Sequence, residues 1–253
     1  MSPFFLAALM SQANKILLMG WTMSVMLGFS PLPKTGVKWQ EDQTVFERRH
    51  MAESAADKTT RFRSIARDLV DVIAEDGALP GMTKRQSMAL MLSIMSYESS
   101  FFRDVDLGVG KGVGDNGRSY CLMQLQVNEA SAPVGPDGKK NLRLGLMQIR
   151  HDVMGAWTGD DVVSDRKKCF RAGRTILARG MGECRDQKAG DKLSAYATGH
   201  CHDNEPKSRL RWSRFEQIMR KRVPTIEESL ALLGRASVED PAPQVEEARL
   251  TQK

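Results

Sequence analysis

The sequence predicts an α+β protein that is predominantly helical and carries one small hairpin and loop region. Several segments space their apolar residues as helices do, whereas turn and short-strand signals gather in residues 104–125, a stretch with five glycines. An apolar content of 41% with 6% aromatic residues fits a packed helical core and not a disordered chain. The length of 253 residues corresponds to one domain of ordinary size with tails.

The N-terminal segment, residues 1–33, is expected to be a signal peptide or a membrane anchor. Lys15 precedes a mainly apolar run over residues 16–32, and Met10 offers an alternative start. Either role predicts an exported protein of the periplasm, the cell envelope or a phage lysis system, with membrane attachment through residues 16–32. The alternative is a buried core helix. The sequence disfavours it because nothing after Pro33 resembles a packing partner.

The rest of the chain divides into a linker, one domain and a tail. Residues 34–60 are polar and weakly patterned, and we expect a linker there. Helical spacing returns at Phe62, and residues 61–223 are expected to form one globular domain. Residues 224–253 are expected to hold a short helix that a capping box opens at Thr225, followed by a disordered tail.

A buried helix that ends on a carboxylate is predicted near the middle of the chain. Thr83 followed by Gln86 is the capping-box signature of a helix start. Residues 88–97 are apolar on nearly every side, which is typical of a buried helix, and Glu98 falls at its end. Burial and the negative end of the helix both favour the neutral form of a carboxyl group, the form that a general acid needs. The alternative is a boundary glutamate that points into solvent.

Three short motifs in order carry a resemblance to a known family. They are Glu98–Phe101 (Glu-Ser-Ser-Phe), Cys121–Leu125 (Cys-Leu-Met-Gln-Leu) and Ala195–Gly199 (Ala-Tyr-Ala-Thr-Gly). The motifs resemble those of the lytic transglycosylases and goose-type lysozymes, and the resemblance covers residues 61–222. Cys121 stands where the family usually has glycine, and the third motif lacks the family's asparagine. The resemblance implies a lysozyme-like fold in which the hairpin forms a small cleft wall.

The hairpin motif occurs a second time, at Leu144–Ile149 (Leu-Gly-Leu-Met-Gln-Ile), and this copy matches the family's letters more closely. We prefer the first copy for the cleft because Leu122 lies 24 residues after Glu98, whereas Leu146 lies 48 residues after it. A local duplication would explain the pair.

The resemblance also implies a reaction and roles for single residues. Glu98 would be the only catalytic acid and base, and Ser99 would help to place the substrate. Met123 and Gln124 would line the cleft floor. Tyr196 would form a hydrogen bond near Glu98 that holds its orientation. The enzyme would cleave the β-1,4 bond between N-acetylmuramic acid and N-acetylglucosamine in peptidoglycan strands and leave 1,6-anhydromuramic acid ends, with no metal and no cofactor, and we expect a monomer.

Two other functions stay open from the sequence. If water replaces the sugar's own hydroxyl, the same site is a hydrolytic muramidase, which would favour a second carboxylate such as Asp106 or Asp115. The chain could also use the fold without catalysis, as a protein that binds or assembles cell wall. In that case replacing Glu98 by glutamine would leave function untouched.

The charge distribution favours an anionic polymer as partner. The formal net charge is +6, and the tail over residues 224–253 is acidic, so the positive charge lies in the central domain. A cell wall with peptide carboxylates fits this charge. We expect no nucleic-acid partner, because no helix-turn-helix, zinc-finger or RNA-binding motif occurs in the sequence.

The four cysteines, Cys121, Cys169, Cys184 and Cys201, lie in the predicted domain and allow up to two disulfides in three pairings. In one of these, Cys169 with Cys184 would tie a helix to the following loop and Cys121 with Cys201 would brace two cleft walls. The rival is a zinc site that uses Cys184 and Cys201 with two histidines, His200 and His202. Their spacing matches no common zinc motif, so we expect no metal.

Overall fold

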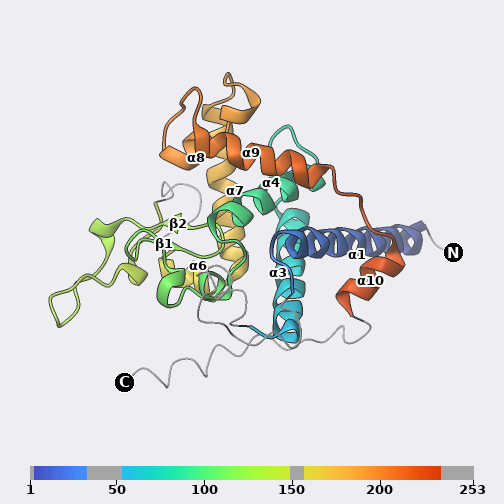
Figure 1. Cartoon of the computed structure of the whole chain (residues 1–253), viewed down its shortest axis with the longest axis horizontal. Helices are drawn as coiled ribbons and strands as arrows, with labels where there is room; N and C mark the ends of the chain where they lie inside the picture. The colour runs from blue at the N-terminus through green and yellow to red at the C-terminus, as the bar shows by residue number, and fades with distance from the viewer. Residues whose placement is uncertain (1–2, 33–52, 149–156, 235–253) are drawn as a thin grey trace, which may run out of the picture.

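The computed structural model describes residues 3–32, 53–148 and 157–234, and these ranges form a mainly helical body with one two-stranded sheet (Figure 1). The predicted α+β, predominantly helical class is therefore confirmed. The lysozyme-like arrangement stays a prediction. Most of the expected linker and of the expected tail lies outside the described residues.

The described part of the chain holds helices of three to twenty-seven residues and a pair of short strands. In chain order these are α1 (Pro3–Phe29), α3 (Ala55–Glu75), α4 (Lys84–Glu98), α5 (Arg103–Asp106), β1 (Ser119–Tyr120), β2 (Leu125–Gln126), α6 (Gly159–Ser164), α7 (Arg166–Glu183), α8 (Ser194–Thr198), α9 (Pro206–Met219) and α10 (Ile226–Leu233), with short 3-10 turns at Gly110–Gly112, Glu129–Ser131, Leu142–Leu144 and Ala189–Asp191.

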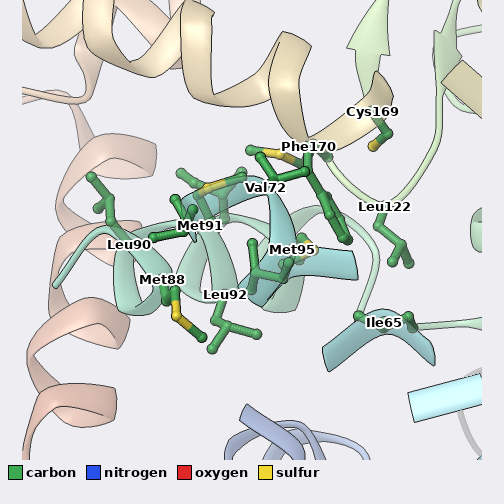
Figure 2. Close-up of a cluster of buried hydrophobic side chains, with 14 of the residues drawn as sticks. Ile65, Val72, Met88, Leu90, Met91, Leu92, Met95, Leu122, Cys169 and Phe170 are labelled. Carbon is green, nitrogen blue, oxygen red and sulfur yellow. The ribbon is translucent and has the colours of Figure 1, made fainter. Parts of the chain in front are cut away.

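Helix α4 lies at the centre of the core, as its sequence predicts. The capping box at its start is present, with Thr83 and Gln86 each bonding the other's backbone N–H. Residues 87–96 are all buried, so the helix has no solvent face over most of its length. Figure 2 shows side chains of α4 meeting those of neighbouring elements, among them Ile65 and Val72 of α3 and Phe170 of α7.

Helix α1 packs on the same core, and the expectation that it has no packing partner is wrong. It contacts α10, α3 and α4, and Figure 1 shows it next to α3 and α10. Trp21 and Met26 are fully buried. Helix α10 comes so close that a Cβ on Gly20 would lie 2.4 Å from Oγ of Ser229. A mainly apolar helix can lie in lipid or in a protein core. The sequence alone therefore could not separate a membrane anchor from a buried core helix.

In the ranges that the structure describes, no helix has both the length and the apolar character needed to cross a membrane. The packed body also extends past the predicted domain limits of 61–223, because α1 lies before them and α10 after them. The short helix predicted from the capping box at Thr225 is confirmed as α10.

The predicted hairpin is present and very short. Strands β1 and β2 are antiparallel, with Ser119 opposite Gln126, and the turn between them closes through a 2.9 Å bond from N of Gln124 to O of Cys121. Cys121 has a φ of 60°, in the left-handed region that favours glycine. This explains why glycine suits the position in the family that the motif resembles. Here Cys121 forms a disulfide with Cys169 of α7 instead.

The second disulfide joins Cys184 and Cys201, so the pairing of Cys169 with Cys184 and of Cys121 with Cys201 is wrong. Cys169 lies in the first turn of α7, and Cys184 is the residue at which that helix ends. A rise of about 1.5 Å per residue separates the two by roughly 20 Å along the helix, far beyond the reach of a disulfide.

If α1 belongs to the folded core, Trp21→Ala should lower the free energy of unfolding of the full chain by about 3–5 kcal/mol, because the substitution leaves a large cavity. Urea unfolding followed by circular dichroism measures this. The matched control is Leu210→Ala, since Leu210 is 54% exposed and its loss should change stability by about 0.5 kcal/mol or less. Equal stability of Trp21→Ala and the unmodified chain would contradict the packing of α1.

Candidate active site at the end of helix α4

Glu98 is the last residue of α4, and the chain leaves the helix through a strained turn. Its side chain is 18% exposed. Ser100 and Phe101 follow with φ of 47° and 56°, two successive left-handed residues without glycine. Each costs about 1–2 kcal/mol relative to a right-handed conformation. Strain of this kind is concentrated at functional sites, where the surrounding structure holds it in place.

Side chains stabilise the turn after Glu98 by forming hydrogen bonds with its backbone. The hydroxyl of Ser99 donates to O of Met95 at 2.7 Å and accepts from N of Phe101 at 3.2 Å. Arg61 of α3 donates to O of Phe101 at 3.0 Å. Ser99 is 3% exposed, so its hydroxyl stabilises the turn and does not lie on the surface, where the resemblance implied contact with substrate.

Arg211 of α9 is the direct partner of Glu98. Its Nε lies 2.8 Å from Oε1 of Glu98, and its Nη2 also bonds that oxygen. The Arg211 side chain is 5% exposed and its guanidinium lies over the ring of Tyr97, 4.4 Å from the centroid. It lies 5.9 Å from the centroid of Tyr196. Glu98 is therefore an ion-paired carboxylate, neither a solvent-facing residue nor an isolated buried acid.

Arg211 was not predicted from the sequence, because none of the three motifs contains it. Its apolar neighbour Leu210 is 54% exposed. The buried positions are Ser208, Arg211, Phe215 and Ile218, which recur at helical spacing. An arginine in line with buried apolar residues was the signal for a buried ion pair, and the expected neutral form of Glu98 did not take this partner into account.

Tyr196 of α8 connects the third motif to the other two. Its hydroxyl donates to O of Met123 at 2.7 Å, so the predicted hydrogen bond near Glu98 exists but does not go to Glu98 itself. Burial, followed by the negative charge of Glu98, raises the pKa of Tyr196 well above its ordinary value, while Arg211 acts in the opposite direction. Tyr196 is thus a neutral phenol that fixes the hairpin turn beside the carboxylate.

Met123 and Gln124 hold the hairpin turn in place. The side chain of Met123 is fully buried against α7, where a Cβ on Gly173 would lie 2.1 Å from its sulfur, so the expectation that Met123 lines a cleft floor is wrong for its side chain. Gln124 is half-buried and donates to O of Cys121 at 3.1 Å and to O of Gly112 at 3.4 Å. Gln124 therefore ties the turn to the glycine-rich loop.

The second copy of the motif extends the outer edge of the hairpin. Met147 forms a bridge with Val127, and N of Gln148 donates to O of Gln126 at 2.8 Å. The first copy is the one that Tyr196 bonds through Met123. This contact agrees with our preference for the first copy. Ile149, the last residue of the second copy, and the following residues 150–156 lie outside the described part of the chain.

Asp106 belongs to a buried ion-pair network and not to the surroundings of Glu98. Arg166 binds both of its oxygens, with 2.9 Å in each bond, and also reaches Asp68 at 2.7 Å. Burial alone would raise the pKa of Asp106, but Arg166 and, more weakly, Arg61 outweigh it and hold the pKa below its ordinary value. The Asp106 side chain is only 2% exposed and Arg166 occupies both of its oxygens, so Asp106 is unsuited to the role of second carboxylate.

Asp115 lies exposed in the turn before β1, where it has a φ of 49°. Hydrogen bonds from Ser119 and Gln126 lower the pKa of Asp115. It thus stabilises the turn, and the structure shows no contact between Asp115 and Glu98 within the described residues.

The rival zinc site would lose two of its ligands, because Cys184 and Cys201 are joined in a disulfide. Among the residues described, no group of three or more histidines, cysteines or acidic side chains is arranged to hold a metal ion.

No protein-family model matches the sequence, and neither a curated protein nor a solved structure matches it. The assignment of a function to the site therefore rests on its geometry and on the three sequence motifs.

Asp106→Asn should destabilise the chain by about 3–5 kcal/mol near neutral pH, because it leaves Arg166 buried without its counter-ion. The lowered pKa of Asp106 means that its stabilisation is present above about pH 4 and is lost as pH falls through the folded-state value. Denaturant unfolding at several pH values should therefore show a steeper acid loss in the unmodified protein than in Asp106→Asn. Asp115→Asn, the exposed control, should change stability little, and an equal loss in both variants would contradict the network.

Proposed function

We propose that this chain is a peptidoglycan lytic transglycosylase in which Glu98 is the single acid and base. The observation that carries the proposal is the convergence of three segments that lie far apart in the sequence. Glu98 is bonded to Arg211, Arg211 lies over Tyr196, and Tyr196 bonds the hairpin turn at Met123. A carboxylate at a strained helix end, surrounded by these groups, is a physically reasonable proton donor and acceptor.

In the first step Glu98, protonated, gives its proton to the oxygen that links N-acetylmuramic acid to N-acetylglucosamine. The glycosidic bond breaks and the N-acetylglucosamine side leaves as an alcohol. Positive charge develops at C1 of the muramic acid, and its own 2-acetamido oxygen stabilises that charge, so no second protein carboxylate is needed.

In the second step Glu98, now a carboxylate, accepts the proton of the C6 hydroxyl of the same sugar. The C6 oxygen bonds C1, closes the 1,6-anhydro ring and displaces the acetamido oxygen. Glu98 ends protonated and ready for the next cycle.

Two further observations bear on the alternatives. The commitment of both oxygens of Asp106 to Arg166 weighs against a muramidase that uses this residue as its second carboxylate. The ion pair between Glu98 and Arg211 favours the non-catalytic alternative, a protein that binds or assembles cell wall, because a buried pair can be purely structural. Two disulfides support the proposed location in the periplasm or cell envelope, since disulfides persist in oxidising compartments.

Digestion of purified peptidoglycan by the full chain, followed by mass spectrometry, tests the proposal. The expected products are lighter by one water than hydrolysed muropeptides. Glu98→Gln should lower turnover by a factor of about 10² to 10⁴, because the amide cannot give up and regain a proton. The matched control is Glu183→Gln. Glu183 is the last residue of α7 and forms an exposed ion pair with Arg179 of the same helix.

Each other outcome has a definite meaning. Products with ordinary reducing ends that disappear in Glu98→Gln would make the protein a muramidase. Equal product from Glu98→Gln and Glu183→Gln would remove Glu98 from the chemistry. Absence of product from the unmodified chain on several wall types would overturn the enzymatic proposal in favour of a binding role.

A further inference from the structure

Charged and phenolic groups reach Glu98 from two elements besides its own helix. Arg211 and Arg214 come from α9, Tyr196 comes from α8, and Tyr97 precedes Glu98 in α4. Of these, Arg211 alone bonds the carboxylate within the described part of the chain. The other three must act on Glu98 through their position or their electrostatic field.

The contact between Arg211 and Glu98 is asymmetric. Both donors, Nε and Nη2, go to the same oxygen, Oε1. Among the described residues, none donates a hydrogen bond to Oε2. The remaining nitrogen of Arg211, Nη1, is buried and has no hydrogen-bond partner among them. The pair thus differs from a bidentate arginine–carboxylate pair, in which two guanidinium nitrogens each bind a different carboxylate oxygen.

This asymmetry has a chemical consequence. An oxygen that accepts two charge-assisted bonds is a poor site for a proton, because protonation would weaken both bonds. The proton of the neutral acid therefore belongs on Oε2. The same oxygen is left without a partner in this part of the chain, so it is the one that can face a glycosidic oxygen or a sugar hydroxyl.

We propose that Arg211 is a positioning residue that fixes Oε1 of Glu98, so that Oε2 carries the transferred proton. This inference rests on the proposed acid and base role of Glu98. Arg211 itself does not touch the reacting atoms. It acts by holding the carboxyl group in one orientation.

The neighbouring arginine cannot take over this function. Arg214 donates to the hydroxyl of Ser96 at 3.2 Å and lies over the ring of Tyr97, 5.3 Å from its centroid. Burial lowers the pKa of Arg214, which the field of Tyr97 partly offsets. Its cation therefore influences Glu98 only at longer range, without fixing either oxygen.

The test is the measurement of kcat and KM for cleavage of purified peptidoglycan by the full chain. Arg211→Met should lower kcat by about tenfold or more and change KM by about twofold or less, because the carboxyl group loses its orientation. Arg211→Lys should recover only part of kcat, since an ammonium lacks the planar fork. The matched control is Arg209→Met, which removes an arginine of the same helix that pairs with Asp191 instead and should leave kcat unchanged.

Two controls keep this inference separate from the proposed function and from misfolding. Thermal melting confirms that each variant is folded, and the unmodified chain is assayed beside the variants. Cleavage by the unmodified chain, with a kcat that falls in Arg211→Met and holds in Arg209→Met, supports the inference. An unchanged kcat in a folded Arg211→Met beside an active unmodified chain overturns the inference alone, whereas absence of cleavage by the unmodified chain overturns the proposed function and the inference with it.

Discussion

The burial of α4 is the constraint on which the other features of the site depend. A helix with no solvent face over residues 87–96 delivers Glu98 to the edge of the core, where an unpaired carboxylate would be costly. Helix α9 meets this requirement by placing Arg211 among its buried positions. The position of α9, the orientation of Tyr196 and the path of the chain after Glu98 are all consistent with that one ion pair.

Two rigid supports surround the ion pair. On one side Arg61 reaches from α3 to the carbonyl of Phe101, and the same arginine borders the buried network of Asp106 and Arg166. On the other side the disulfide between Cys121 and Cys169, with the close approach of Met123 to α7, fixes the hairpin turn that Tyr196 bonds. A strained turn and a short hairpin need such supports, because neither has enough backbone hydrogen bonds of its own to stay in place.

Local chemistry in the sequence predicted a good part of this architecture. The capping boxes at Thr83 and Thr225 are present and open α4 and α10, and the apolar run before Glu98 is indeed buried. What failed depended on distant contacts. The packing of α1 needs α10, some two hundred residues later, and the partner of Glu98 comes from α9, 113 residues later. The disulfide pairing depended on the full length of α7, which places Cys169 and Cys184 at opposite ends of one helix.

We propose that the end of α4, the hairpin turn and α8 together form a glycan-binding site. Chemical-shift mapping tests this most directly, with the isotope-labelled, full-length Glu98→Gln variant titrated with a soluble peptidoglycan strand fragment. We expect that backbone signals of Ser99, Gln124 and Tyr196 move together and saturate with one affinity. Saturable shifts confined to α1 and α10, or no saturable shifts in the site at concentrations where the protein binds the fragment, would contradict it.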